Sequence, residues 1–259
     1  MFVPGITSSA ASGRLFVISG QALYCRNMQV PEGAPDGADW LYLGALDGVP
    51  CFARTGDAVA DAELVPLRQL FGVLSDEEFA IAGRALALTA WDRDHRHCGR
   101  CGAPTERSPV ERVRACTACG YHAYPRLSPA VIVAVERDGK ILLARNARTR
   151  MPFHSVLAGF VEIGESLEDC VAREVAEEAG IAIRDIRYFG SQPWPLTGSL
   201  MVGFTAHWAH GELCADEGEI LEPAWHPPDA LPTLPGKLSI ARALIDDFVR
   251  RAGATSSGA

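Results

Sequence analysis

The 259-residue chain has no long apolar run, no excess of basic residues and no internal repeat. A membrane-spanning helix needs about 18 or more consecutive apolar residues, and no run in this sequence approaches that length. Residues 1–5 lack the basic start and long apolar core of a secretory signal peptide. We therefore expect a cytoplasmic protein without a membrane segment.

The charge balance is acidic. Lys and Arg total 24 against 32 Asp and Glu, which gives a net charge of −8. This balance argues against a protein built to coat nucleic acid, although it leaves room for a local basic groove. Hydrophobic residues make up 48% of the chain, so a chain of this length can bury a sizeable core and hold more than one domain.

Four of the eight cysteines form two Cys-x-x-Cys pairs. Fourteen residues separate the pairs, slightly fewer than the roughly 15 to 20 typical of four-cysteine zinc sites. A redox dithiol usually needs only one such pair. Four thiolates fill the tetrahedral coordination of zinc and leave no open position, so we expect a structural rather than a catalytic ion. The predicted zinc ligands are Cys98, Cys101, Cys116 and Cys119.

Acidic residues crowd one predicted helix. Ser166 begins this helix with Asp169 three residues on, and Gly180 ends it. Apolar residues every four positions give the helix a buried stripe, formed by Leu167, Val171 and Val175.

Another face of the helix carries Glu174, Glu177 and Glu178, whose like charges repel by a few tenths of a kcal/mol per pair. The preceding loop adds Glu162 and Glu165. The ordinary explanation is a solvated acidic face. Hard oxygen ligands crowded beside a glycine-bounded loop instead favour Mg²⁺ or Mn²⁺.

The spacing from Gly159 to Ile181 reads G-x5-E-x7-R-E-U-x-E-E-x-G-U, with U an aliphatic residue. It resembles the signature of the Nudix hydrolases, which cleave nucleoside diphosphates linked to another moiety. The resemblance implies an α/β/α sandwich with a mixed sheet, hence an α+β or α/β fold class. It also implies divalent ions held by Glu174, Glu178 and the backbone carbonyl of Ala158. Arg173 is expected to pair with Glu165.

A second motif follows the helix, Ser191-Gln192-Pro193-Trp194-Pro195-Leu196-Thr197-Gly198-Ser199. It resembles the SQPWPFPxS element of the NADH pyrophosphatase branch, which also has an N-terminal domain, a four-cysteine ribbon and a Tyr-Pro matched by Tyr124 and Pro125. That branch hydrolyses NADH to NMNH and AMP, some members remove NAD caps from RNA, and a homodimer is usual. Leu196 and Thr197 replace the Phe-Pro of the branch, which bears on affinity and dinucleotide preference.

The resemblance assigns roles to further residues. Glu219 matches the late acidic ligand of the branch, and Glu177, Glu178 and Glu219 all remain candidates for the general base. Aromatic side chains are candidate stacking surfaces, with core packing as the alternative for Phe160, Tyr124 and Trp194. The full set of expected substrate contacts is Glu111, Tyr124, Phe160, Gln192, Pro193, Trp194, Pro195, Leu196, Thr197, Gly198, Ser199 and Ala241.

We expect four segments: a mainly β N-terminal domain over 1–93, a zinc ribbon over 94–125, a Nudix domain over 126–251 and a disordered tail over 252–259. Two other functions stay open. One is a Nudix hydrolase of ADP-ribose or another dinucleotide. The other is a non-catalytic zinc-ribbon protein that binds RNA or senses NAD. A basic loop formed by Arg145, Arg148 and Arg150 could guide RNA phosphates or simply be solvated.

Overall fold

The computed structural model describes residues 1–256 apart from 38, 57–60, 148–151 and 217. The chain divides into two compact units. The first comprises Met1–Arg126 together with Pro195–Gly198, and the second comprises Leu127–Trp194 and Ser199–Ala259. Among the described residues, no helix is long and apolar enough to span a membrane.

A sheet of seven strands forms most of the first unit. Its order is β1-β5-β6-β2-β3-β7, with β4 paired to β2. The β2–β6 pair is parallel and the other pairs are antiparallel. The strands are β1 (Phe2–Pro4), β2 (Gly13–Ser19), β3 (Ala22–Cys25), β4 (Glu32–Gly33), β5 (Leu41–Leu46), β6 (Val49–Thr55) and β7 (Glu63–Pro66), followed by the short 3-10 helix η1 (Leu67–Leu70).

Helix α1 (Asp76–Asp94) packs against this sheet and buries Ile81 and Leu88 in the same cluster as Phe16. The helix begins where Ser75 Oγ accepts a hydrogen bond from the Glu78 backbone N–H at 3.2 Å. The Glu78 carboxylate in turn accepts from the backbone N–H of Ser75, which completes a capping box. This cap fixes the first residue of the helix at Asp76.

The ribbon completes the first unit with a three-stranded antiparallel sheet, in the order β10-β9-β8. Its strands are β8 (Thr105–Arg107), β9 (Arg114–Cys116) and β10 (His122–Ala123). Gly102 and Gly120 have φ angles of 77° and 67°. These left-handed turns, which favour glycine, directly follow the second cysteine of each pair.

The second unit is built on a mixed sheet of order β14-β15-β11-β12-β16, with β13 paired to β11. The β11–β15 pair is parallel and the others are antiparallel. The elements are β11 (Ser128–Arg137), β12 (Lys140–Asn146), β13 (Leu157–Phe160), α2 (Leu167–Ala179), β14 (Ala182–Trp194), β15 (Ser199–His210), β16 (Ile220–His226) and α3 (Ile240–Ser256).

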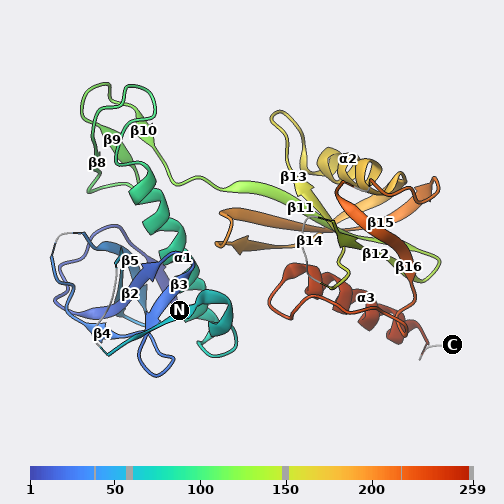
Figure 1. Ribbon diagram of the computed structural model, residues 1–259, viewed down its shortest axis with the longest axis horizontal. Helices are drawn as coiled ribbons and strands as arrows, with labels where there is room; N and C mark the ends of the chain where they lie inside the picture. The colour runs from blue at the N-terminus through green and yellow to red at the C-terminus, as the bar shows by residue number, and fades with distance from the viewer. Residues whose placement is uncertain (38, 57–60, 148–151, 217, 257–259) are drawn as a thin grey trace. The chain divides into compact units, whose positions relative to one another are not determined.

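Helices α2 and α3 cover opposite faces of this sheet (Figure 1). Successive side chains of β11 alternate between the faces, as a strand requires. Val131 and Val133 pack in the cluster with Val175 of α2, whereas Ile132 packs in the cluster with Leu244 of α3. The predicted α/β/α sandwich with a mixed sheet is confirmed.

The end of α3 differs from the sequence prediction. The helix runs to Ser256, whereas the sequence predicted a disordered tail over 252–259, and residues 257–259 lie outside the described part of the chain. Within the helix, the Arg251 guanidinium pairs with Asp247 one turn earlier at 2.8 Å and also with Glu136 on β11. These contacts hold the part of the helix around Arg251 against the sheet.

Candidate functional site

Two glutamates of α2 face the body of the second unit. The Ser166 Oγ accepts the backbone N–H of Asp169 at 3.1 Å at the start of the helix, and Gly180 ends it with a φ of 71°. Glu174 and Glu178, one helical turn apart, are only 8% and 5% exposed. Glu219 lies just before β16, and one carboxylate oxygen from each of the three glutamates lies within 4.8 Å of the others. The structure thus brings together three of the sequence-predicted ligands.

The electrostatics of this trio are those of a cation site. Burial, followed by the charges of Glu174 and Glu219, raises the pKa of Glu178 to about 8. Burial also raises the pKa of Glu174, although Arg173 opposes it. The Glu178 Oε2 atom is buried without a hydrogen-bond partner among the described residues. Crowded, desolvated carboxylate oxygens are the ligands that Mg²⁺ and Mn²⁺ prefer, so the residues fit the expected ion.

A close approach between β13 and α2 positions Glu174. A Cβ added to Gly159 would lie 1.8 Å from the Glu174 side-chain carboxyl carbon, so only glycine leaves room for this carboxylate. The neighbouring Ala158, the expected carbonyl ligand, lies on the same strand opposite Ile132. The first glycine of the sequence motif thus makes space for a predicted ligand.

Arg173 connects the loop to the helix. Its Nε and Nη2 donate to the two carboxylate oxygens of Glu165 at 2.8 and 2.9 Å, which confirms the predicted pairing. The same guanidinium donates to Glu174 at 2.8 Å, to Glu177 at 2.9 Å and to the carbonyl of Phe160 at 2.9 Å. Its hydrogen bonds lower the pKa of Glu165 to about 2. Glu177 is thereby held at the surface, outside the buried trio.

The four ribbon cysteines converge, with all four Sγ atoms within 4.8 Å of one another. The Sγ atoms of Cys98 and Cys119 are 3.7 Å apart, and those of Cys101 and Cys116 are 3.5 Å apart. A tetrahedron with zinc–sulfur bonds of about 2.3 Å has edges of about 3.8 Å, so these separations fit zinc. Backbone N–H groups of Cys119 and Ala118 lower the pKa of Cys116 to about 6, which favours the thiolate.

The expected stacking residues differ in exposure. Phe160 is 58% exposed and Tyr124 is 51% exposed, so neither is a core residue. The Tyr124 hydroxyl donates to Glu111 at 3.1 Å within the first unit. Trp194 is half-buried, Ser199 is 3% exposed, and Leu196 packs against the hydrophobic cluster of the first unit.

Two of the expected substrate contacts serve the start of α3. The Gln192 amide oxygen accepts the backbone N–H of Ile240 at 2.8 Å, and its amide nitrogen donates to the carbonyl of Leu238 at 2.8 Å. Both ends of the side chain are therefore engaged by backbone, and the contact of Gln192 with substrate stays a prediction. Ala241 is 6% exposed and packs in the cluster beneath α3.

Sequence reasoning missed one acidic neighbour of the trio. Asp216 contacts the end of α2 by donating its backbone N–H to the carbonyl of Glu178 at 3.0 Å, and its charge helps to raise the pKa of Glu178. In the basic loop, Arg145 pairs with Glu222 at 2.7 Å. Arg148 and Arg150 lie outside the described residues.

Known proteins share this arrangement. Family models match three segments: an NADH pyrophosphatase-like rudimentary NUDIX domain over residues 9–91, an NADH pyrophosphatase zinc ribbon domain over 93–124 and a NUDIX domain over 126–248. The NAD-capped RNA hydrolase NudC of Deinococcus radiodurans is 42% identical over 95% of this chain and 91% of its own length. The protein of the same name from Pseudomonas aeruginosa is 47% identical over 73% of this chain and 68% of its own.

A solved Nudix hydrolase from Nitrosomonas europaea shares the fold, with a TM-score of 0.52 and 21% identity over 63% of this chain and 93% of that structure. The long match to the Deinococcus relative, the three domain matches and the glutamate and cysteine clusters agree with one another. The chain belongs to the Nudix hydrolase family, in the zinc-ribbon branch of the NADH pyrophosphatases and NAD-capped RNA hydrolases.

Proposed function

We propose that the chain hydrolyses the diphosphate bond of NAD(H), giving NMN(H) and AMP, and removes NAD caps from RNA 5′ ends. The observation that carries this proposal is the buried trio Glu174, Glu178 and Glu219, whose carboxylate oxygens converge within 4.8 Å. The two relatives named NAD-capped RNA hydrolase support the choice of substrate.

The three carboxylates, with the carbonyl of Ala158, would hold Mg²⁺ or Mn²⁺, which stabilises charge on the diphosphate and makes water more acidic. Arg173 fixes the loop around Glu165 against α2 and so keeps Glu174 in place. Arg173 also donates to Glu177 at 2.9 Å and holds this exposed carboxylate at the surface, outside the buried trio. We therefore place proton transfer from the attacking water on Glu178 or Glu219 rather than on Glu177.

Planar groups of the substrate need aromatic partners. Phe160 directly follows Gly159, the β13 residue that lies against the Glu174 carboxyl group. The Phe160 side chain is mostly exposed. We propose Phe160 as a stacking surface next to the diphosphate, with Tyr124 and Trp194 as further candidates. Gln192 and Ala241 then act through the position of α3 rather than by direct contact.

A parallel assay tests this function. The full chain is given NADH, NAD⁺, ADP-ribose and NAD-capped RNA with Mn²⁺, and the products are separated by chromatography. We expect NMNH and AMP from NADH and a 5′-monophosphate end from capped RNA. Preferential turnover of ADP-ribose would replace the proposed substrate, and absence of turnover with all four would indicate a non-catalytic regulator.

The state of the cysteines bears on the cellular compartment of the protein. All eight are free thiols in the structure, and the four of the ribbon are spaced for zinc rather than for disulfides. We infer a reducing compartment, the cytoplasm. A homodimer is also expected from the family resemblance, and light scattering on the purified chain would test it.

A further inference from the structure

One loop of the ribbon, residues 108–113, carries Glu111 between two arginines that face each other. The loop joins β8 to β9. Arg107, the last residue of β8, lies directly opposite Arg114, the first residue of β9. Like charges opposite one another on neighbouring strands repel, so this pairing needs a counter-charge where the loop begins and ends.

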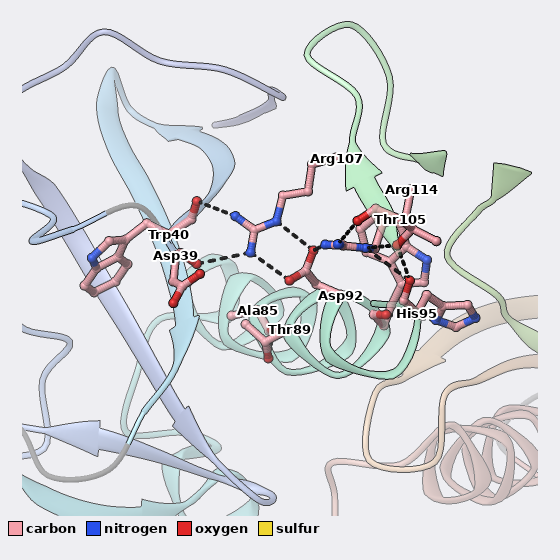
Figure 2. Close-up of polar contacts among 10 residues, drawn as sticks. Asp39, Trp40, Ala85, Thr89, Asp92, His95, Thr105, Arg107 and Arg114 are labelled. Carbon is pink, nitrogen blue, oxygen red and sulfur yellow. Dashed lines mark hydrogen bonds and ion pairs between the residues drawn. The ribbon is translucent and has the colours of Figure 1, made fainter. Parts of the chain in front are cut away.

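Asp92, in the last turn of α1, supplies that charge (Figure 2). Its carboxylate is 3% exposed and accepts from Arg107 at 2.7 Å through both oxygens and from Arg114 at 2.6 Å through one. Burial acts to raise the pKa of Asp92, but the hydrogen bonds of the two arginines outweigh it and the pKa lies below its ordinary value. One charged carboxylate therefore clamps both ends of the loop.

The remaining donors of the two arginines fix their direction. Arg114 is 8% exposed and also donates to the hydroxyl of Thr105 at 2.8 Å and to its carbonyl at 2.7 Å. Arg107 donates to the carbonyls of Trp40 and Asp39, both at 3.3 Å. The two ends of the loop are thereby held against α1 and against the segment before β5.

The middle of the loop is anchored as well. Ser108 Oγ accepts the backbone N–H of Glu111 at 3.3 Å, and Arg112 donates to the carbonyl of Tyr42 at 2.8 Å. The Glu111 side chain is exposed, and its carboxylate accepts from the Tyr124 hydroxyl at 3.1 Å. The arginines of this segment thus contact the N-terminal domain, while Glu111 stays at the surface beside Tyr124.

Stability alone gives a weak reason for the clamp. A buried ion pair is often no more stabilising than well-packed apolar residues of similar volume. Charge-assisted hydrogen bonds are directional, and a bidentate pair such as that of Arg107 with Asp92 specifies one geometry. The clamp therefore defines where the loop lies more than how stable the domain is.

We propose that Asp92 is a positioning residue for the dinucleotide, because through Arg107 and Arg114 it holds the loop 108–113 so that Glu111 can contact substrate. The role of Glu111 rests on the proposed function, whereas the clamp rests on the hydrogen bonds alone. Asp92 is buried and acts only through the loop, so its loss should lower affinity for substrate rather than slow the chemical step.

Three variants of the full-length chain test the clamp. Arg107→Gln releases the β8 end of the loop while Asp92 keeps Arg114, so no buried charge is left alone. Asp92→Asn removes the charge from both ends. Asp94→Asn is the control, because Asp94 lies on the same helix but is exposed and pairs with Arg93 at 2.7 Å.

Each variant is made with and without Glu111→Ala, and KM and kcat for NADH are measured with Mn²⁺. Loss of one hydrogen bond to substrate corresponds to a roughly three- to tenfold rise in KM, which we expect in Glu111→Ala, Arg107→Gln and Asp92→Asn with kcat nearly unchanged. Once Glu111 is replaced, the clamp variants should raise KM little further, because they act through the same carboxylate. Asp94→Asn should behave as the parent does.

Three kinetic results would overturn the proposal. The first is an unchanged KM in Arg107→Gln, and the second is an unchanged KM in Glu111→Ala. The third is an equal rise in KM with and without Glu111, since Asp92 would then support the fold only. If Asp92→Asn failed to fold, its melting curve would show it, and Arg107→Gln would decide the outcome.

Hydrogen exchange separates this inference from the proposed function. We expect the backbone amides of 108–113 to exchange faster in Arg107→Gln than in the parent and in Asp94→Asn, with zinc content unchanged. Unchanged exchange would disprove the clamp even if KM rose. If NADH were not hydrolysed at all, the proposed function would fail, and exchange together with the Kd for NADH, read from its fluorescence, would still decide the inference.

Discussion

Glu178 is the most deeply buried glutamate of α2. Burial, followed by the neighbouring carboxylates Glu174, Glu219, Asp216 and Glu177, raises its pKa to about 8. Without a cation, the folded protein therefore holds a proton on Glu178 at neutral pH, which the unfolded chain would release. Stability of the metal-free protein should fall as the pH rises from about 4.5 to about 8, because only the folded state binds this proton there.

The same proton links cation binding to pH. Because the ion binds the charged carboxylate, we expect Mn²⁺ affinity to increase from pH 6 to about 8 and then to level off. Calorimetry in buffers of different ionisation enthalpy would show release of a proton on binding at pH 7. Affinity that stays constant over this range, with no proton release, would contradict the burial of Glu178 as an ion ligand.

Gly159 should be required for the position of Glu174. In Gly159→Ala the new methyl group would occupy the place of the Glu174 carboxyl group, so this side chain must move. A displacement of about 1 Å can reduce a catalytic rate by roughly a hundredfold, and we expect a loss of kcat of that order. Gly190→Ala is the matched control, because a Cβ there meets open space. Equal activity of the two variants would show that Glu174 needs no such space.

At the scale of secondary-structure elements, local sequence patterns were enough to predict the extent of α2 but not the contacts that β14 makes. The apolar stripe, the Ser166 cap and Gly180 all lie within the helix or next to it, so the sequence predicted its extent. The hydrogen bond that Gln192 accepts could not be predicted, because its donor Ile240 lies 48 positions further along the chain. The Glu174–Gly159 contact was hidden for the same reason: a glycine in a motif does not show which side chain needs the space.

The stability of the ribbon should depend on its bound zinc. Cys98→Ser or Cys116→Ser should release the metal and lower the melting temperature by roughly 10 °C or more, since zinc binding energy stabilises this small fold. Cys214→Ser is the control, because Cys214 is exposed and outside the ribbon. Zinc content by atomic absorption and a melting curve would be measured together. Full zinc content and full stability in both ribbon variants would disprove the assignment.

The segment 191–199 should determine the KM for NADH. Trp194→Ala should raise KM for NADH while the melting temperature changes little, because the ring is half-buried at the end of β14. Val110→Ala serves as a control for loss of an exposed apolar side chain elsewhere, since Val110 is 76% exposed. A large fall in melting temperature with unchanged KM would instead identify Trp194 as a packing residue.

Across the whole molecule, the two metal chemistries belong to separate units. The four cysteines lie in the first unit and the glutamate trio in the second. The sequence motifs indicated both metal sites, because most of the ligand residues are concentrated in short stretches of the chain. The sheet order of the first unit and the arginine cluster around Asp92 were beyond sequence reasoning, since they bring together residues as distant as Asp39 and Arg107.

The central claim, that the buried glutamates of α2 hold the catalytic cation, is tested most directly by Glu178→Gln. The change removes a ligand charge while keeping side-chain volume, with Glu168→Gln as a control at an exposed position of the same helix. The measurement is kcat for NADH at saturating Mn²⁺, with a melting curve alongside. We expect kcat to fall by roughly two to three orders of magnitude in Glu178→Gln only, with stability held or slightly raised. Near-normal turnover in Glu178→Gln would contradict the claim, and a collapse of its melting temperature would make Glu178 a structural residue.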